Sequence, residues 1–276
     1  MTQGNGHLGG RFIFGGGAPR SGTGLVQNIL DSHPQIYGGP EFGRTPTLVE
    51  LYKKMCMGGG VDFFYPPSQM TEWIRELFCR IFLPHAVRNG AEWISEMTPF
   101  NVMVFSDLMD LFPEARFVLV IRDPRAVVSS LLQVAERARQ KGNPPPGVAA
   151  TLQDAMQCVL TCAVRSQEAL RKDSSRVIIV QYENLVQNPE REIKSLSASL
   201  GVEFFPEMLH PGEKKHDAEI ALDGVWYDRQ MFYRDPDPSE IDKWKRLLTP
   251  EQQRLVTTLF QQVRWFQELG YCFNLE

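Results

Sequence analysis

The chain has 276 residues, and its 29 Lys and Arg against 33 Asp and Glu give a formal net charge of −4. No run approaches the ~18 consecutive apolar residues of a membrane-spanning helix, and the polar start of the chain lacks the apolar core of a signal peptide. The mild acidic excess argues against a dedicated nucleic-acid-binding protein, because such proteins carry a basic surplus. We therefore expect no membrane or nucleic-acid partner, and any bound anion must be held by a few placed groups.

The five cysteines give no sign of a disulfide framework or a metal site. Their number is odd and no CxxC motif occurs. Cys158 and Cys162 are spaced as neighbours on an apolar helix face, which is typical of packing. We expect no bound metal and a location in the reducing cytoplasm. The alternative is a luminal catalytic domain separated from its membrane anchor.

Apolar patterning predicts helices and strands in alternation along most of the chain. A strand is predicted at 11–15, helices at 21–32, 71–87 and 101–111, and a buried strand at 116–121. Further helices are predicted at 125–139, 148–172 and 189–200, with a buried strand at 176–182. Residues 204–238 show no period, and the last two helices are predicted at 239–247 and 250–269.

Strands separated by helices predict an α/β fold with a central, mainly parallel sheet flanked by helices. No internal repeat and no long linker divides the chain. We therefore expect one domain at 11–276, preceded by a flexible N-terminus at 1–10.

A glycine-rich loop at 15–24 joins the first strand to the first helix. In that position glycines let backbone N–H groups surround an anion, and the helix N-terminus adds its positive dipole end. Arg20 places a cation in the loop, and Ser21 and Thr23 supply hydroxyl donors. An ATP-type P-loop is disfavoured, because the two residues after Gly22 are not the Lys and Ser or Thr that this motif needs. The loop predicts an anion bound without a metal; the alternative is a turn without a ligand.

A second anion site is predicted where the strand at 116–121 ends. Arg122 leaves the carboxyl end of this strand, and open α/β sheets bind ligands at that edge. Ser130 follows about two helical turns later and offers a hydroxyl, so the pair suits a separate phosphate group. The alternatives are a structural ion pair between Arg122 and Asp123 and, for Arg125, a surface charge.

The two sites together resemble the sulfotransferases that use 3′-phosphoadenosine 5′-phosphosulfate (PAPS), most closely the tyrosylprotein sulfotransferase branch. Segments similar to that family lie at 14–25, 30–34, 111–126, 180–189 and 242–245, in the family's order and spacing. The resemblance implies a single α/β domain with a P-loop-like phosphosulfate loop. It also implies transfer of a sulfuryl group from PAPS to an acceptor hydroxyl or amine, with PAP as the product and no metal.

The resemblance assigns the donor-binding positions. The 5′-phosphosulfate would be held by Arg20, Ser21, Gly22, Thr23 and Gly24. The rest of the donor would be held by Arg122, Ser130, Tyr182 and Arg234. Arg20 would also be catalytic, because negative charge develops on the leaving phosphate oxygen during an in-line displacement. For Arg234 the alternative is a solvated loop charge.

Glu41 is the candidate general base, in the loop after the first helix. The tyrosylprotein enzymes carry a Gly-Glu-Glu-Thr-Arg segment there, and a gap-free pairing places the second glutamate on Glu41. The alternative is an ordinary surface glutamate, with His216 and Glu96 as reserve bases. The family lysine that contacts the transferred group is replaced by Met97, so either Arg44 substitutes for it or fewer charges are used.

The identity of the acceptor is less well specified by the sequence than the donor or the reaction. Candidate acceptor contacts are Arg44, Glu96, Met97, His216 and Trp226. Aromatic residues in this half suit a flat acceptor, whereas the acidic residues of 204–238 suit a cationic one. We expect a small, natural-product-like molecule; a peptide tyrosine is the alternative, and a homodimer is compatible with the sequence. The rival classes are a nucleotide kinase and a non-catalytic nucleotide-binding protein.

Overall fold

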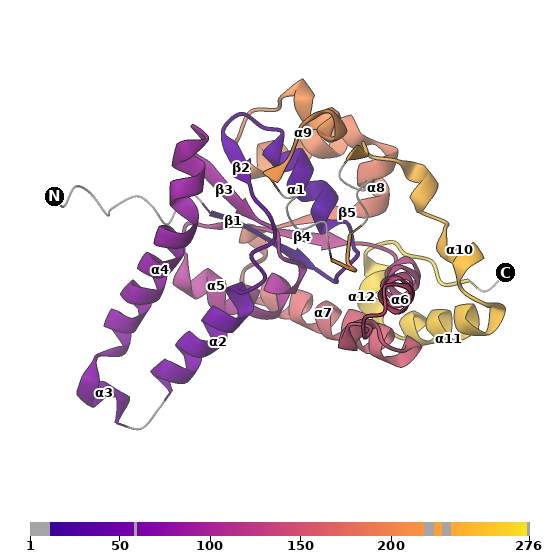
Figure 1. Ribbon diagram of the computed structural model, residues 1–276, viewed down its shortest axis with the longest axis horizontal. Helices are drawn as coiled ribbons and strands as arrows, with labels where there is room; N and C mark the ends of the chain where they lie inside the picture. The colour runs from indigo at the N-terminus through magenta and orange to yellow at the C-terminus, as the bar shows by residue number, and fades with distance from the viewer. Residues whose placement is uncertain (1–11, 58–59, 218–223, 228–232, 275–276) are drawn as a thin grey trace.

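The computed structural model describes residues 12–57, 60–217, 224–227 and 233–274 of the chain. The described residues form a parallel sheet with the strand order β2-β3-β1-β4-β5, seen at the centre of Figure 1. The strands are β1 (Phe12–Gly17), β2 (Ile36–Gly38), β3 (Trp93–Glu96), β4 (Arg116–Ile121) and β5 (Val177–Gln181). The predicted α/β fold is therefore confirmed. The flexible N-terminus predicted at 1–10 lies outside the described residues.

Each face of the sheet has its own apolar core, because side chains alternate between the faces along every strand. In β1, Phe12 and Phe14 belong to one core and Ile13 to the other. The helices that pack on the Phe12 side include α4 (Pro67–Arg88), α5 (Phe105–Leu111), α6 (Pro124–Gln140), α7 (Leu152–Asp173), α11 (Pro250–Gln261) and α12 (Arg264–Glu268). The helices on the Ile13 side are α1 (Thr23–Asp31), α8 (Tyr182–Gln187) and α9 (Pro189–Leu200).

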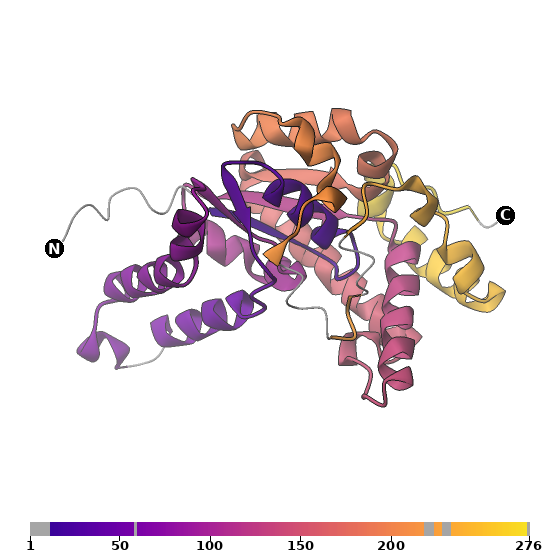
Figure 2. The ribbon, with the colours of Figure 1, turned by 45° about the horizontal axis from the view of Figure 1, so that its top comes forward.

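An arm extends from one side of the sheet (Figures 1 and 2). It consists of α2 (Thr45–Cys56), α3 (Val61–Phe64) and α4. The residues between β2 and α2 lead from the edge of the sheet into this arm, and they include Glu41. A further short helix, α10 (Trp244–Leu247), lies beside α6.

Most predicted elements are present, and the differences have local causes. The strands β2 and β3 were not predicted, because three and four residues are too few to show a pattern. Helix α2 was also not predicted. The helix predicted at 101–111 is wrong in its first half, where a 3₁₀-helix at Pro99–Val104 precedes α5.

The two last predicted helices are each divided. In place of the helix predicted at 239–247 the structure has a 3₁₀ turn at Pro238–Glu240 and then α10. Within 250–269 the chain forms α11 and then α12. The break lies at Val263, whose φ of −93° and ψ of 89° are not helical.

The sheet order brings the two predicted anion sites together. Strands β1 and β4 are neighbours, with Gly17 paired to Val120, so the loop after β1 and the residue after β4 lie at the same edge. This edge is the carboxyl end of a parallel sheet, where such folds place their ligands. Among the described residues, no helix is both long enough and apolar enough to cross a bilayer.

Candidate functional site

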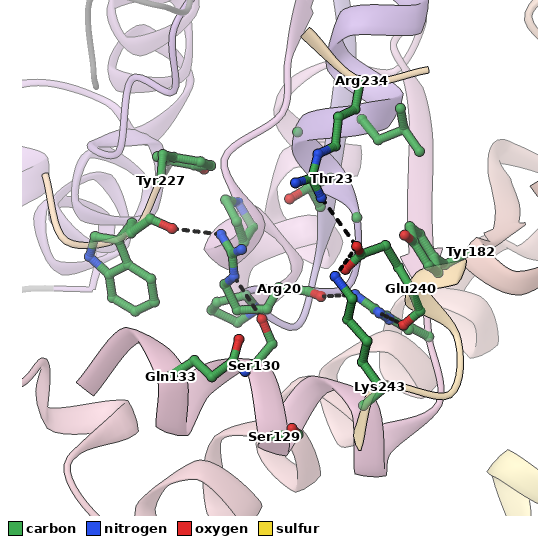
Figure 3. Close-up of a pocket in the computed structure, with 18 of the residues that line it drawn as sticks. Arg20, Thr23, Ser129, Ser130, Gln133, Tyr182, Tyr227, Arg234, Glu240 and Lys243 are labelled. Atoms are coloured by element: carbon green, nitrogen blue, oxygen red, sulfur yellow. Dashed lines mark hydrogen bonds and ion pairs between the residues drawn. The ribbon is translucent and has the colours of Figure 1, made fainter. Parts of the chain in front are cut away.

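A cavity of about 450 Å³ lies at the carboxyl ends of β1 and β4 (Figure 3). Its walls come from the glycine-rich loop, α1, α6, and two segments that are distant in sequence, 224–227 and 234–247. The predicted site residues that line it are Arg20, Gly22, Thr23, Gly24, Glu41, Arg122, Ser130, Tyr182, Trp226 and Arg234. The structure therefore brings together ten of the predicted positions in one cavity.

The loop after β1 has a backbone that aims Arg20 into the cavity. Gly22 precedes α1 with a φ of 109°, and a Cβ added there would lie 2.6 Å from Cδ2 of Tyr182. Only glycine fits this position. Arg20 itself has a φ of 76°, an uncommon conformation for a residue with a side chain, which is typical of functional loops. Ser21 is buried beside Gly17 and does not line the cavity.

Arg20 lies at the centre of a cluster of positive charge. Its Nε donates to the Ser130 hydroxyl (3.2 Å) and its Nη1 to the Trp226 carbonyl (2.7 Å), as Figure 3 shows. Arg137 on α6 donates to the same carbonyl at 3.4 Å. Burial, and then the charges of Arg137 and Arg122, lower the pKa of Arg20 to about 10. Like charges held this close are stabilised by an anion placed between them.

Arg122 lies beside this cluster. Its Nη1 donates to the Arg20 carbonyl at 3.4 Å, and its guanidinium carbon lies 4.1 Å from the centre of the Tyr182 ring. Among the described residues, Nε of Arg122 and the hydroxyl of Ser129 are buried without a hydrogen-bond partner. Because a buried donor without a partner costs free energy, these two groups indicate a ligand with hydrogen-bond acceptors.

Arg234 and Lys243 lie at the rim of the cavity around a single carboxylate. Arg234 contacts Oε1 of Glu240 at 3.1 Å, and Lys243 donates to the same oxygen. The carbonyl of Glu240 accepts from Nη2 of Arg122 at 2.9 Å. Segment 234–247 is therefore attached to Arg122 by a polar contact (Figure 3).

Glu41 faces the cavity from the residues between β2 and α2. The hydroxyl of Tyr227 donates to its Oε1. Burial, and then the negative charge of Glu96, raise the pKa of Glu41 to about 8, while the positive charge of Arg20 acts against this rise. A carboxyl with a pKa near the working pH can accept and release a proton, which is the property of a general base.

Glu96 and Arg44 do not line the cavity. Glu96 is buried and accepts hydrogen bonds from the Thr45 hydroxyl (3.0 Å), from Nδ2 of Asn101 (2.6 Å), and from the backbone and hydroxyl of Thr98. These bonds fix the chain on either side of β3 and the start of α2. Arg44 is exposed, and its Nη1 lies 3.5 Å from the carbonyl of the residue before it.

Met97 and His216 are also outside the cavity. Met97 is buried against β1, where its sulfur would lie 1.7 Å from a Cβ added to Gly15. Its side chain brings no charge to the site. His216 is buried between Asp31 (Nδ1 to Oδ2, 2.6 Å) and the Pro211 carbonyl (Nε2 to O, 2.7 Å). These contacts attach the chain around His216 to the end of α1.

Several residues of the cavity wall were not predicted from the sequence. Ser129, Gln133 and Arg137 lie four residues apart along α6 and share one face of it. Their helical spacing next to Ser130 is the signal in the sequence that could have identified them. Tyr227 was among the aromatic residues expected near the acceptor, but no local pattern predicts its contact with Glu41 across 186 residues of chain. Among the described residues, no group of three His, Cys, Asp or Glu side chains could hold a metal ion.

The comparisons with known proteins agree on one family. Its profile, described as the sulfotransferase family, matches residues 12–207. Protein-tyrosine sulfotransferase 1 of Danio rerio is 25% identical over 246 residues, which cover 88% of this chain and 68% of that protein. Nodulation protein NoeE of Sinorhizobium fredii is 26% identical over 94% of this chain and 66% of its own. The chain thus spans about two thirds of the length of these relatives.

Solved structures share the fold. The sulfotransferase domain from the curacin biosynthetic pathway has a TM-score of 0.62 at 20% identity, covering 91% of this chain and 97% of that one. Mouse sulfotransferase SULT7A1, solved in complex with PAP, has a TM-score of 0.54 at 15% identity, covering 95% and 88%. The family profile matches well over half of the chain, including every strand of the described sheet. The chain is therefore an enzyme of the sulfotransferase family.

Proposed function

We propose that this enzyme transfers a sulfuryl group from PAPS to a hydroxyl or amine of a small-molecule acceptor. The observation that carries the proposal is the convergence of Arg20, Arg122 and Arg137 with the raised-pKa carboxyl of Glu41 in one cavity. The three guanidinium groups suit a ligand with several negative charges, and Glu41 suits an acceptor that must lose a proton. Membership of the sulfotransferase family supports the same donor.

The donor would lie across the two anion sites. The 5′-phosphosulfate would bind at the loop residues before α1, where Arg20 and the backbone N–H groups of the helix start can surround it. The 3′-phosphate would bind at Arg122 with the hydroxyls of Ser129 and Ser130. Such a ligand supplies the acceptors that Nε of Arg122 and Oγ of Ser129 lack.

The reaction would be an in-line displacement at sulfur. Glu41 takes the proton of the acceptor hydroxyl or amine as the new O–S or N–S bond forms. Arg20 stabilises the charge that develops on the bridging phosphate oxygen as PAP leaves. Arg137 lies beside Arg20 and would supply the cation that relatives have as a lysine at the position of Met97.

The nature of the acceptor rests on the remaining space. The cavity of about 450 Å³ has to hold the donor as well, so the space left beside Phe100 and Trp226 suits a compact molecule with an apolar part. A peptide tyrosine is the second candidate, favoured by the protein-tyrosine sulfotransferases among the relatives. We further propose a cytoplasmic location, which is consistent with five cysteines that are all free thiols.

Thermal shift and transfer assays test this function. We expect PAP to raise the unfolding temperature by several degrees and ATP with magnesium to leave it unchanged. Radiolabelled PAPS should then transfer its sulfate to a member of a panel of phenols, alcohols, amines and tyrosine peptides. Stabilisation by ATP with magnesium and not by PAP would overturn the donor assignment. A label found on tyrosine peptides alone would replace the small-molecule acceptor with the peptide one.

A further inference from the structure

Two successive residues of segment 224–227 contact both groups to which the proposed reaction assigns catalytic roles. The carbonyl of Trp226 accepts from Nη1 of Arg20 at 2.7 Å. The hydroxyl of Tyr227 donates to Oε1 of Glu41. We call residues 224–227 the covering segment. Its tyrosine hydroxyl occupies the place on Glu41 that an acceptor hydroxyl would need.

The ring of Tyr227 also lies against the proposed phosphosulfate loop. A Cβ added to Gly24 would be 3.8 Å from Cε1 of this ring, so the ring packs on the first turn of α1. The guanidinium carbon of Arg20 lies 5.8 Å from the ring centre. Figure 3 shows Tyr227 and Arg20 on the same side of the cavity. The phenol is thus held between the base and the loop that would bind the sulfuryl group.

We propose that Tyr227 is an internal acceptor and that the enzyme sulfates its own tyrosine hydroxyl. This inference rests on the proposed function, because it needs PAPS in the cavity and Glu41 as the base. A bond forms between Oη of Tyr227 and the sulfur of PAPS, and the bond from sulfur to the bridging 5′-phosphate oxygen breaks. The proton of Oη passes to Glu41, and PAP leaves. No oxidation or reduction occurs.

The geometry distinguishes Tyr227 from the exposed tyrosine nearest to it in sequence. Tyr233 is 54% exposed and, unlike Tyr227, is not among the described residues that line the cavity. Nonspecific sulfation would favour the more accessible hydroxyl of Tyr233. Sulfation within the site would favour Tyr227, which already donates to the base.

Sulfated Tyr227 would hinder the binding of a second donor molecule. A sulfate on Tyr227 places a permanent negative charge beside Arg20 and Arg137, the cations that the donor needs. The sulfated enzyme should therefore bind PAP more weakly, and self-sulfation should stop at about one sulfate per chain. Acceptor sulfation would then depend on how fast an acceptor displaces the covering segment.

The experiment incubates the full chain with PAPS and no acceptor. Intact-mass spectrometry measures the number of sulfates per chain, and fragmentation that preserves sulfotyrosine identifies the residue. We expect one added SO₃ group on Tyr227, with a first-order rate that does not change with protein concentration. Tyr233→Phe should label like the parent chain, and Tyr227→Phe should not label. Glu41→Gln keeps an oxygen for the Tyr227 hydroxyl and should slow labelling by ~10²–10⁴-fold.

Calorimetry with PAP on the same preparation separates the two proposals. If PAP binds and PAPS sulfates an added acceptor while Tyr227 remains unmodified, the internal acceptor is wrong and the proposed function stands. Labelling of Tyr233 in place of Tyr227, or a rate proportional to protein concentration, also contradicts the inference. If PAP does not bind, the proposed function fails and the internal acceptor fails with it.

Discussion

The two sides of the cavity differ in how they are attached to the fold. The proposed donor side consists of the loop before α1, Arg122, and the Ser129 face of α6, all of which continue directly from the paired strands β1 and β4. The proposed acceptor side consists of Glu41, the covering segment and residues 234–247, and the last two reach the site through polar contacts such as Arg20 to the Trp226 carbonyl. Donor binding must replace some of those contacts. We infer that the donor side is formed in advance and that the acceptor side adjusts to the donor.

Glu41→Gln gives the largest expected effect, because it removes the proposed base while the proposed donor contacts stay in place. The amide keeps the size and an oxygen acceptor but cannot take a proton. We expect kcat to fall by ~10²–10⁴-fold, while the PAP dissociation constant stays within about threefold. Single-turnover transfer from PAPS and calorimetry with PAP measure the two quantities. An active Glu41→Gln variant would show that the base is elsewhere.

Arg122→Ala tests the donor side in the same way. The side chain is expected to contact a phosphate, and its loss should weaken PAP binding by about 2–3 kcal/mol, or ~30–150-fold in dissociation constant. The matched control is Arg246→Ala, which removes an exposed arginine of α10 that does not line the cavity. Equal weakening by both variants would mean that only general charge attracts the donor.

The pH dependence of the rate follows from the raised pKa of Glu41. A carboxyl with a pKa of about 8 is mostly protonated at pH 7 and can accept a proton only after it ionises. We therefore expect kcat/KM for PAPS, which reports the free enzyme, to rise about tenfold between pH 7 and pH 9. Glu41→Gln should abolish this rise. A profile that is flat from pH 6 to 9 in the parent chain would contradict the role of Glu41.

Glu96→Gln separates a structural carboxylate from the reacting one. Glu96 accepts several hydrogen bonds away from the cavity, so an amide there leaves donors poorly matched. We expect the free energy of unfolding to fall by about 1–3 kcal/mol, with kcat of the folded enzyme reduced less than tenfold. Denaturant unfolding and the transfer assay measure both. A loss of kcat as large as that of Glu41→Gln would make Glu96 the better candidate base.

The difference between the two sides of the cavity also explains how much of the structure could be predicted from the sequence. The strands at 116–121 and 176–182, and the loop around Arg20, were predictable because their signals lie within a few consecutive residues, although the second strand was expected to be buried and β5, at the edge of the sheet, is only partly so. Tyr227 and Trp226 reach Glu41 and Arg20 across 186 and 206 residues, and no local pattern encodes such contacts. Sequence therefore predicted most of the residues of this part of the cavity wall, while their role in donor binding stays a prediction.

The acceptor side was predicted only in fragments. Trp226 was expected there as an aromatic acceptor contact and does line the cavity, whereas Arg234, which lines it too, was expected at the donor. His216 was expected there too, but its ring is held between α1 and the Pro211 carbonyl. Met97 was expected to contact the acceptor as well, but it is buried against Gly15, and this contact depends on the pairing of β1 with β3. Long-range packing decides which of these side chains face the ligand.

Arg234→Ala gives the smallest expected effect and tests the boundary between the two sides. The side chain is 44% exposed and already contacts Glu240, so solvent and that carboxylate screen its charge from a phosphate. Its removal also frees Glu240, which Lys243 can still neutralise. We expect the PAP dissociation constant to rise no more than about fivefold, measured by calorimetry beside Arg122→Ala. A loss as large as that of Arg122→Ala would mean that Arg234 leaves Glu240 and closes on the donor, which would place residues 234–247 on the donor side.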